Sequence, residues 1–436
     1  MDVMNRRRAL KLLAAGAALP RLATRLRAQS IQIGPVESTA CKVTQDDASF
    51  LDDLQRRACM FFFEQASPDT GQVLDRAKAF DAPGVRDTRR MASIAATGFG
   101  LTALCIADRR GYIPHDAIVT RVRNTLRFHH DKLENDHGFF SHFNDIETGA
   151  PFRGSEISPI DTSLLLCGVL TARQHFRDSE IRQLATDIYH RVDWTWMLNG
   201  GDMFAMGWRN GSFLKGRWNH YCELMMMYLL ALGSPTHPIG SASWDAWERP
   251  VMHFEDYTYV SAADPLFVHQ YSHAWFDFRK KHDKFVNYFE NSVIATRAHK
   301  AFCISLGAPY SADYWGITAS DSQHGYRAWG GPPAHGGIDG SVVPCAAGGS
   351  LAFVPSDCLQ VLRALKQNYG DKAWGRYGFC DAFNPKDGWY DPDCLGIDQG
   401  ITVVMAENLR TGFVWSTFAH NPEVAVAFKR AGFHAS

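Results

Sequence analysis

The chain has 436 residues, with 45 Lys and Arg against 46 Asp and Glu, so its formal net charge is −1. This balance provides no basic field for nucleic acid or anionic lipid, and it favours an uncharged ligand. Ten cysteines are scattered singly, with no C-x-x-C pair and no metal-type Cys/His spacing. That pattern argues against a disulfide scaffold and a zinc site and indicates core thiols, with one or two disulfides left open.

The N-terminal segment has the features of a signal peptide. Arg6-Arg7-Arg8 precedes an apolar run over residues 9–20, and an A-x-A-type cleavage site ends near Ala28. The run is too short for a membrane anchor, and the consecutive arginines favour the twin-arginine export machinery as a partner. We therefore expect residues 1–28 to be removed and residues 29–436 to form one monomeric periplasmic domain. The alternative is a basic cytosolic tail.

Helical periodicity dominates the remainder. Apolar residues recur with this period over residues 50–63, 92–107, 118–133, 161–176, 181–197, 218–232, 285–304, 356–369 and 399–410. No stretch alternates apolar and polar residues long enough to require a sheet. Alternating short and long loops between helices of similar length are typical of an all-α toroid of paired helices whose long loops form a cleft at one end. A bundle or a solenoid is the alternative, and the lack of a fixed repeat disfavours the solenoid.

Residues 307–350 differ in kind, because they carry aromatic side chains among many glycines and prolines without helical period. Long irregular loops in compact domains are usually functional or disordered, and disorder normally comes with few aromatics. We therefore expect an ordered wall over a ligand site, in which Tyr314, Trp315 and Trp329 could stack on sugar rings. Asp321 lies in the same loop, although each such Asp alone could be a turn residue.

Glycoside hydrolysis commonly requires two carboxyl side chains in different environments, and three further segments offer candidates. The first runs from Gly138 through Asp145 to Glu156 and Asp161. Asp161 stands just before an apolar helix, where a carboxylate can simply cap the backbone N–H groups. Glu156 lies in the preceding loop and is expected to face the cleft.

Glu223 lies in the second segment, which is apolar on nearly every helical face from residue 218 to residue 232. Removal of a carboxylate from water raises its pKa, which a general acid working near neutrality requires. The alternative is a buried Glu paired with an Arg.

The third segment places Asp398 at a helix start, where capping and catalysis are compatible. Glu407 and Arg410 are spaced three residues apart on one helical face, which predicts a structural ion pair.

With these motifs the sequence resembles the glucoamylase-like domain family and, within it, the β-1,2-glucanases of glycoside hydrolase family 144. The matching signals are Gly138-Phe-Phe, Ser155-Glu156-Ile-Ser-Pro-Ile-Asp161-Thr162, the Glu223 segment ending in Leu232-Gly-Ser-Pro-Thr-His-Pro238, Tyr314-Trp-Gly316, and Asp391-Pro through Gly396-Ile-Asp398-Gln-Gly400. The resemblance covers nearly all of residues 29–436.

The resemblance implies an (α/α)6 barrel, inverting cleavage of β-1,2-glucan, and no metal or organic cofactor. Glu223 corresponds to the family's general acid, and the base is expected to be Asp398 or, as second choice, Asp161. Endo and exo action are both compatible with the sequence. The residues expected to contact the glucan are Glu156, Asp145, His220, Tyr314, Trp315, Asp321, Trp329 and Gln399.

Two other functions remain open from the sequence. A toroid polysaccharide lyase or epimerase would use His and Tyr, but the loops lack the Arg and Lys needed for uronate carboxylates. A glucan-binding protein without catalysis would need only an aromatic cleft. Such a binder has no reason to bury Glu223 in an apolar segment.

Overall fold

The structure is a computed structural model that describes residues 31, 33, 43–263 and 265–436. The predicted signal peptide, residues 1–28, lies outside these described residues. None of the helices within them combines the length and the apolar character needed to cross a membrane.

Helices and very short strands alternate along the described chain. The helices are α2 (Gln45–Glu64), α3 (Ile94–Arg110), α4 (His115–Asp131), α5 (Pro159–His175), α6 (Ser179–His190), α7 (Trp194–Leu198), α8 (Met225–Gly233), α9 (Ala242–Ala246), α10 (Tyr288–Ser305), α11 (Pro344–Gly348), α12 (Pro355–Ala373), α13 (Gly396–Thr411), α14 (Phe413–Ala419) and α15 (Pro422–Arg430). The 3₁₀ helices are η1 (Phe152–Gly154), η2 (Leu266–His269) and η3 (Tyr271–Ala274).

The strands form antiparallel pairs and build no larger sheet within the described residues. The pairs are β1 (Arg76–Lys78) with β15 (Asp393–Leu395), β2 (Met91–Ser93) with β5 (Phe143–Asp145), β3 (Asn135–Asp136) with β4 (Phe139–Phe140), β6 (Trp208–Arg209) with β7 (Ser212–Phe213), β8 (Val251–Phe254) with β9 (Tyr257–Val260), β10 (Lys281–His282) with β16 (His434–Ala435), β11 (Trp374–Gly375) with β12 (Gly378–Phe379), and β13 (Phe383–Asn384) with β14 (Trp389–Tyr390).

Two layers of helices form the body of the molecule. Nearly every residue of α3, α5, α8 and α13 is buried, as expected for helices that are apolar on all sides. In contrast, α2, α4, α6, α12 and α15 bury one face and expose the other. The first set is therefore the inner layer, and the amphipathic helices surround it.

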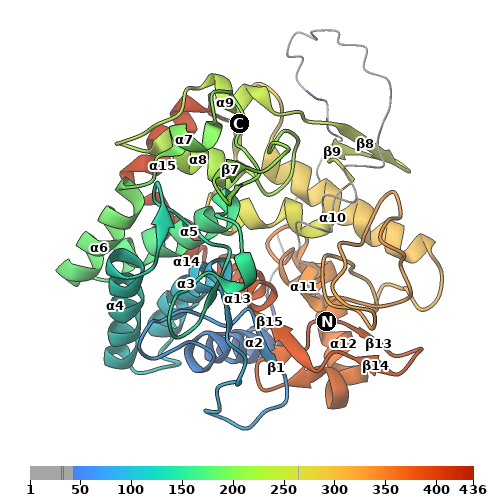
Figure 1. Ribbon diagram of the computed structural model, residues 1–436. Coiled ribbons are helices and arrows are strands. Elements are labelled where there is room, and N and C mark those ends of the chain that lie inside the picture. Colours follow the sequence, from blue (N-terminus) through green and yellow to red (C-terminus); the bar gives the residue numbers. More distant parts are fainter. Residues whose placement is uncertain (1–30, 32, 34–42, 264) are drawn as a thin grey trace.

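The inner elements close into a ring. Helix α3 packs against α5 and α13, α5 packs against α8, and η3 packs against both α8 and α13. On the outside, α2 covers α3 and α13, α15 covers α8, α10 covers η2, and α12 covers α11. Figure 1 shows α3, α5 and α13 side by side in the middle of the molecule, with α4, α6 and α12 at its periphery. The predicted all-α toroid is confirmed.

Most predicted helical segments match observed helices. Residues 181–197 were predicted as one continuous helix. This is wrong, because α6 ends at His190 and a separate short helix, α7, follows. The prediction over residues 218–232 is wrong in its first half, since α8 begins only at Met225. The side chains of Trp218 and Tyr221 are buried there without helical backbone.

Two glycines allow the backbones of α3 and α5 to touch. A Cβ atom at Gly168 would lie 2.0 Å from the carbonyl oxygen of Gly98, and a Cβ atom at Gly98 would lie 2.2 Å from that of Leu164. Real Cβ atoms do not approach backbone this closely, so any side chain here would force the two inner helices apart.

We therefore expect Gly168→Ala to lower the free energy of unfolding by about 1–3 kcal/mol or more, the usual effect of overpacking a core. Denaturant unfolding of both forms would measure the change. Gly240→Ala is the matched control, because a Cβ atom at Gly240 meets nothing within 4 Å. Equal stability of Gly168→Ala and wild type would contradict the close packing of α3 on α5.

Candidate active site

Two strand pairs bring the amino ends of three inner helices to one end of the ring. Strand β2 leads into α3 and pairs with β5, while β15 leads into α13 and pairs with β1. The backbone N–H of Ile94, at the start of α3, donates to the carbonyl of His142, and Ser158, at the start of α5, donates to Phe140. Side chains in the first turns of α3, α5 and α13 therefore lie near one another.

Glu223 lies in a turn directly before α8, two residues from its first residue, and not inside a helix as the sequence predicted. The Ser272 hydroxyl fixes this turn, because it donates to the Glu223 carbonyl oxygen at 2.8 Å and accepts the Met226 N–H at 3.0 Å. The Glu223 residue is only 2% exposed. The expectation of a buried Glu is thus confirmed, although its local backbone is different.

Asp161 lies in the first turn of α5, and the cap is Ser158, whose hydroxyl oxygen accepts the Asp161 N–H at 3.1 Å. The alternative in which Asp161 itself is the N-cap residue is therefore wrong. Its carboxylate accepts a short hydrogen bond from the Ser158 hydroxyl. Pro159 at the first helical position explains the boundary, because its missing N–H needs no partner there.

A histidine that the sequence analysis did not single out connects Asp161 with Glu156. His142 Nδ1 lies 3.4 Å from Glu156 Oε1, and His142 Nε2 lies 3.5 Å from Asp161 Oδ1. All three residues are buried, and the His142 ring stacks on Phe143 at a centroid distance of 3.7 Å. The structure therefore joins two of the predicted site residues through one imidazole.

Asp398 lies in the first turn of α13, as the sequence predicted for a helix start. It lines a cavity of about 10 Å³, enough for about one water molecule, together with Asp381 and Gln399. A side-chain hydrogen bond joins Asp381 to Asp398. The Gln399 amide instead donates to the carbonyl of Phe379 at 2.9 Å.

The β13–β14 hairpin brings further carboxyl groups to Asp398. Asp381 precedes β13 and Asp391 follows β14, so the pairing of the two strands places both at the open end of the hairpin. Asp321 joins them, because its backbone N–H donates to Asp381 Oδ2 at 2.7 Å. Carboxylate oxygens of Asp321, Asp381 and Asp391 all lie within 4.8 Å of one another.

Burial raises the pKa of each member of this group. The pKa of Asp321 rises to about 6 and that of Asp391 to about 8, and burial followed by the charge of Asp398 raises the pKa of Asp381 well above its usual range. Arg76 opposes the effect at Asp321, with which it forms an ion pair. The group therefore retains protons near neutral pH, because closely spaced buried carboxyl groups repel one another when all are ionised.

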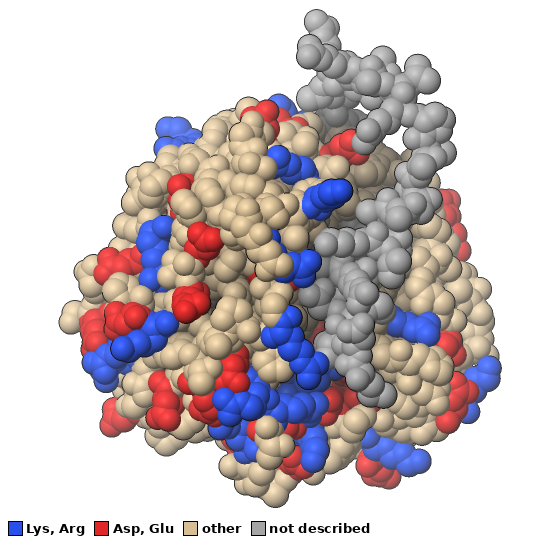
Figure 2. Space-filling model, in the orientation of Figure 1, with Lys and Arg blue, Asp and Glu red and all other residues tan. Residues whose placement is uncertain are grey.

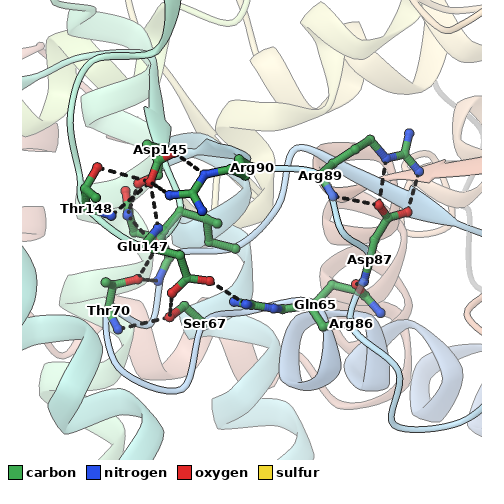
Figure 3. Close-up of polar contacts among 12 residues, drawn as sticks. Gln65, Ser67, Thr70, Arg86, Asp87, Arg89, Arg90, Asp145, Glu147 and Thr148 are labelled. Carbon is green, nitrogen blue, oxygen red and sulfur yellow. Dashed lines mark hydrogen bonds and ion pairs between the residues drawn. The ribbon is translucent and has the colours of Figure 1, made fainter.

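The carboxylate of Asp145, a predicted substrate contact, is hydrogen bonded to other groups of the protein. Arg90 donates to both of its carboxylate oxygens at 2.6 Å, and Asp145 Oδ1 accepts the backbone N–H of Glu147 and Thr148 (Figure 3). The Arg90 hydrogen bonds hold the pKa of Asp145 well below its usual range. Figure 3 also shows Glu147 with Arg86, and Asp87 with Arg89, beside this turn. A sugar contact at Asp145 would have to compete with Arg90.

The aromatic side chains of residues 307–350 lie mainly in the core. Trp315 is 0% exposed, Trp329 is 1% exposed, and the Trp329 ring N–H donates to the Ser320 hydroxyl at 3.0 Å. Tyr314 donates to the carbonyl of Gly340 at 3.0 Å. The loop is ordered as expected, and both tryptophan rings are almost fully buried, so the stacking of Trp315 and Trp329 on sugar rings stays a prediction.

Two other residues or pairs named from the sequence have a defined place in the structure. His220 is half-buried next to Asn219, at 3.1 Å between Nδ1 and Oδ1. The predicted ion pair between Glu407 and Arg410 is wrong, because Glu407 pairs with Arg110 at 2.8 Å and Arg410 pairs with Asp52 at 3.1 Å.

The cysteines between residues 59 and 394 are buried, as expected for core thiols, whereas Cys41 lies outside the described residues. On the face shown in Figure 2, acidic and basic side chains are intermixed, in keeping with the net charge of −1. An extended basic field for nucleic acid is not seen on that face.

A comparison with known proteins identifies a protein family that this chain matches. Residues 215–422 match the family model "Putative glucoamylase". The chain is 30% identical over 421 residues to the exo β-1,2-glucooligosaccharide sophorohydrolase (non-reducing end) of Parabacteroides distasonis, an alignment that covers 87% of this chain. The chain spans only 57% of the length of that relative.

Two crystal structures are similar over almost their whole length. The endo-β-1,2-glucanase of Chitinophaga pinensis, in complex with sophorotriose and glucose, has a TM-score of 0.82 and 28% identity, and the match covers 89% of this chain and 98% of that chain. A "putative glucoamylase" of Bacteroides caccae has a TM-score of 0.81 and 30% identity, with 89% and 100% coverage. The chain therefore belongs to the glucoamylase-like domain family and, within it, to glycoside hydrolase family 144.

Proposed function

We propose that this protein is a glycoside hydrolase that cleaves β-1,2-glucan with inversion at the anomeric carbon. The observation that carries the proposal is the placement of buried Glu223, Asp161 and Asp398 at the amino ends of α8, α5 and α13, in a toroid similar to those of proteins named as β-1,2-glucan hydrolases. Helix amino ends favour negative charge, which suits carboxylates that must ionise during the reaction.

In this proposal Glu223 and Asp398 each transfer one proton during the reaction. Glu223 donates a proton to the leaving glycosidic oxygen, and Asp398 takes a proton from the attacking water, either directly or through a substrate hydroxyl. Both protons move between oxygen atoms, so no cofactor is needed. Glu156 and His142 are proposed to contact sugar hydroxyls beside Asp161.

The test is to incubate the purified protein with linear β-1,2-glucan and to follow new reducing ends, with β-1,3-glucan as the control substrate. Chromatography of early products separates exo action, which releases one disaccharide, from endo action, which releases a range of lengths. NMR at early times is expected to detect the α-anomer, since inversion of a β-linkage yields it. If the protein retains glucan on a column but forms no reducing ends, it is a binding protein.

We also propose export to the periplasm through the twin-arginine route, on the basis of Arg6, Arg7 and Arg8 before a short apolar run. Replacing these arginines with Lys keeps the charge and is expected to leave the precursor in the cytoplasm. Immunoblots of cytoplasmic and periplasmic fractions measure the result, and an unchanged periplasmic yield would contradict this route.

A further inference from the structure

Asp381 lies outside the predicted catalytic set, yet its side chain is hydrogen bonded to that of Asp398. The two residues are 3% and 5% exposed and line the same small cavity. Two carboxylates in direct contact and away from water cannot both be ionised, because their repulsion is hardly screened. One proton must therefore lie between them.

The surroundings decide which of the two carboxyl groups carries this proton. Asp398 is in the first turn of α13, where the helix dipole and the unpaired backbone N–H groups stabilise a carboxylate. Asp381 lies in the loop before β13, outside any helix, and faces the carboxyl groups of Asp321 and Asp391. Asp381 is therefore the better proton carrier, and Asp398 the better carboxylate.

We propose that Asp381 is a positioning residue that donates its proton to Asp398 and so keeps this carboxylate oriented and ionised. This inference rests on the proposed function, in which Asp398 is the general base. It adds a residue that does not itself contact the substrate but acts through Asp398.

Other charged and titratable groups around the pair are consistent with a single negative charge on it. The Arg76 guanidinium is paired with Asp75 and Asp321, and Arg89 is paired with Asp393. Burial raises the pKa of the adjacent Cys380 and Cys394 thiols well above the usual range, so both stay neutral. Asp391, with a pKa raised to about 8, is also mainly protonated at neutral pH.

Two variants of similar size separate positioning from packing. Asp381→Asn keeps a donor for Asp398 and is expected to retain kcat/KM within about tenfold, with an unchanged acid limb of the pH profile. Asp381→Leu removes the donor and is expected to lose more than tenfold in kcat/KM. Its acid limb should move to higher pH by about 1 unit or more, because loss of a hydrogen bond to the charged form raises the pKa of Asp398. Asp371→Asn, on the exposed face of α12, is the control.

Infrared spectroscopy tests the proton without any need for activity. The difference spectrum between wild type and Asp381→Asn at neutral pH should contain the band of one protonated buried carboxyl group that the variant lacks, while the band of Asp391 cancels because it is present in both. This measurement shows whether Asp381 carries the proton even if β-1,2-glucan is not the substrate or Asp381→Leu does not fold. Failure of this inference can therefore be distinguished from failure of the proposed function.

Three results would overturn the proposal. The first is an acid limb at the same pH in folded Asp381→Leu and wild type. The second is a difference spectrum between wild type and Asp381→Asn that contains no band of a lost protonated carboxyl group. The third is a melting temperature that CaCl2 raises and EDTA lowers in wild type but not in Asp381→Asn, since a divalent cation would then balance these carboxylates in place of the proton.

Discussion

Replacement of Glu223 with Gln is expected to lower the turnover of β-1,2-glucan by about 10²–10⁴-fold, the usual contribution of a positioned general acid. Gln has nearly the same volume as Glu but carries no transferable proton. The turn that holds residue 223 depends on Ser272 and on backbone atoms, which the substitution does not touch. The variant should therefore remain folded and still bind glucan.

Three measurements make this test specific. Steady-state kinetics gives kcat, isothermal titration with glucan oligosaccharides gives binding, and an aryl glycoside with a good leaving group bypasses the need for the acid. The loss should be much smaller on the aryl glycoside, because its leaving group departs without protonation. Glu134→Gln, at an exposed turn after α4, is the matched control. Turnover of Glu223→Gln within a few-fold of wild type on unactivated glucan would remove Glu223 from the mechanism.

The inner ring could be predicted from the sequence because its helices are buried on every side. Segments such as α3 and α5 are apolar throughout, and their helical period and length leave few alternatives. The region before α8 shows the limit of this reasoning. Trp218 and residues 221–224 are buried like the helix that follows, and only Asn219 and His220 are half-buried, so burial continues across a boundary at which the backbone changes.

The candidate site was predictable only where single residues stand at helix starts or in apolar segments. Asp398 and Glu223 have such local signals. Asp381 and His142 do not, because backbone hydrogen bonds between separate segments, from Asp381 to Asp393 and from His142 to Glu156, bring them to their partners. The burial of Trp315 and Trp329 could not be predicted for a different reason, since an aromatic residue in an irregular loop looks the same in sequence whether the loop is exposed or packed.

Asp398→Asn is expected to lower turnover by at least about 10²-fold, because an amide cannot accept the proton of the attacking water. The fold should survive, since Asn can still accept a hydrogen bond from Asp381 and the backbone carbonyl of residue 398 keeps its bond from Thr402 at 2.8 Å. Binding of glucan should change little.

Asp161→Asn provides the comparison that identifies the base. Asp161 is also buried in the first turn of an inner helix, but its neighbours are Ser158 and His142, both of which can hydrogen bond an amide oxygen. Its backbone N–H keeps the Ser158 cap, so α5 should start at the same residue and turnover should fall less than in Asp398→Asn. Single-turnover kinetics of both variants near pH 7 measures the chemical step directly. A larger loss in Asp161→Asn than in Asp398→Asn would exchange their roles and make Asp161 the general base.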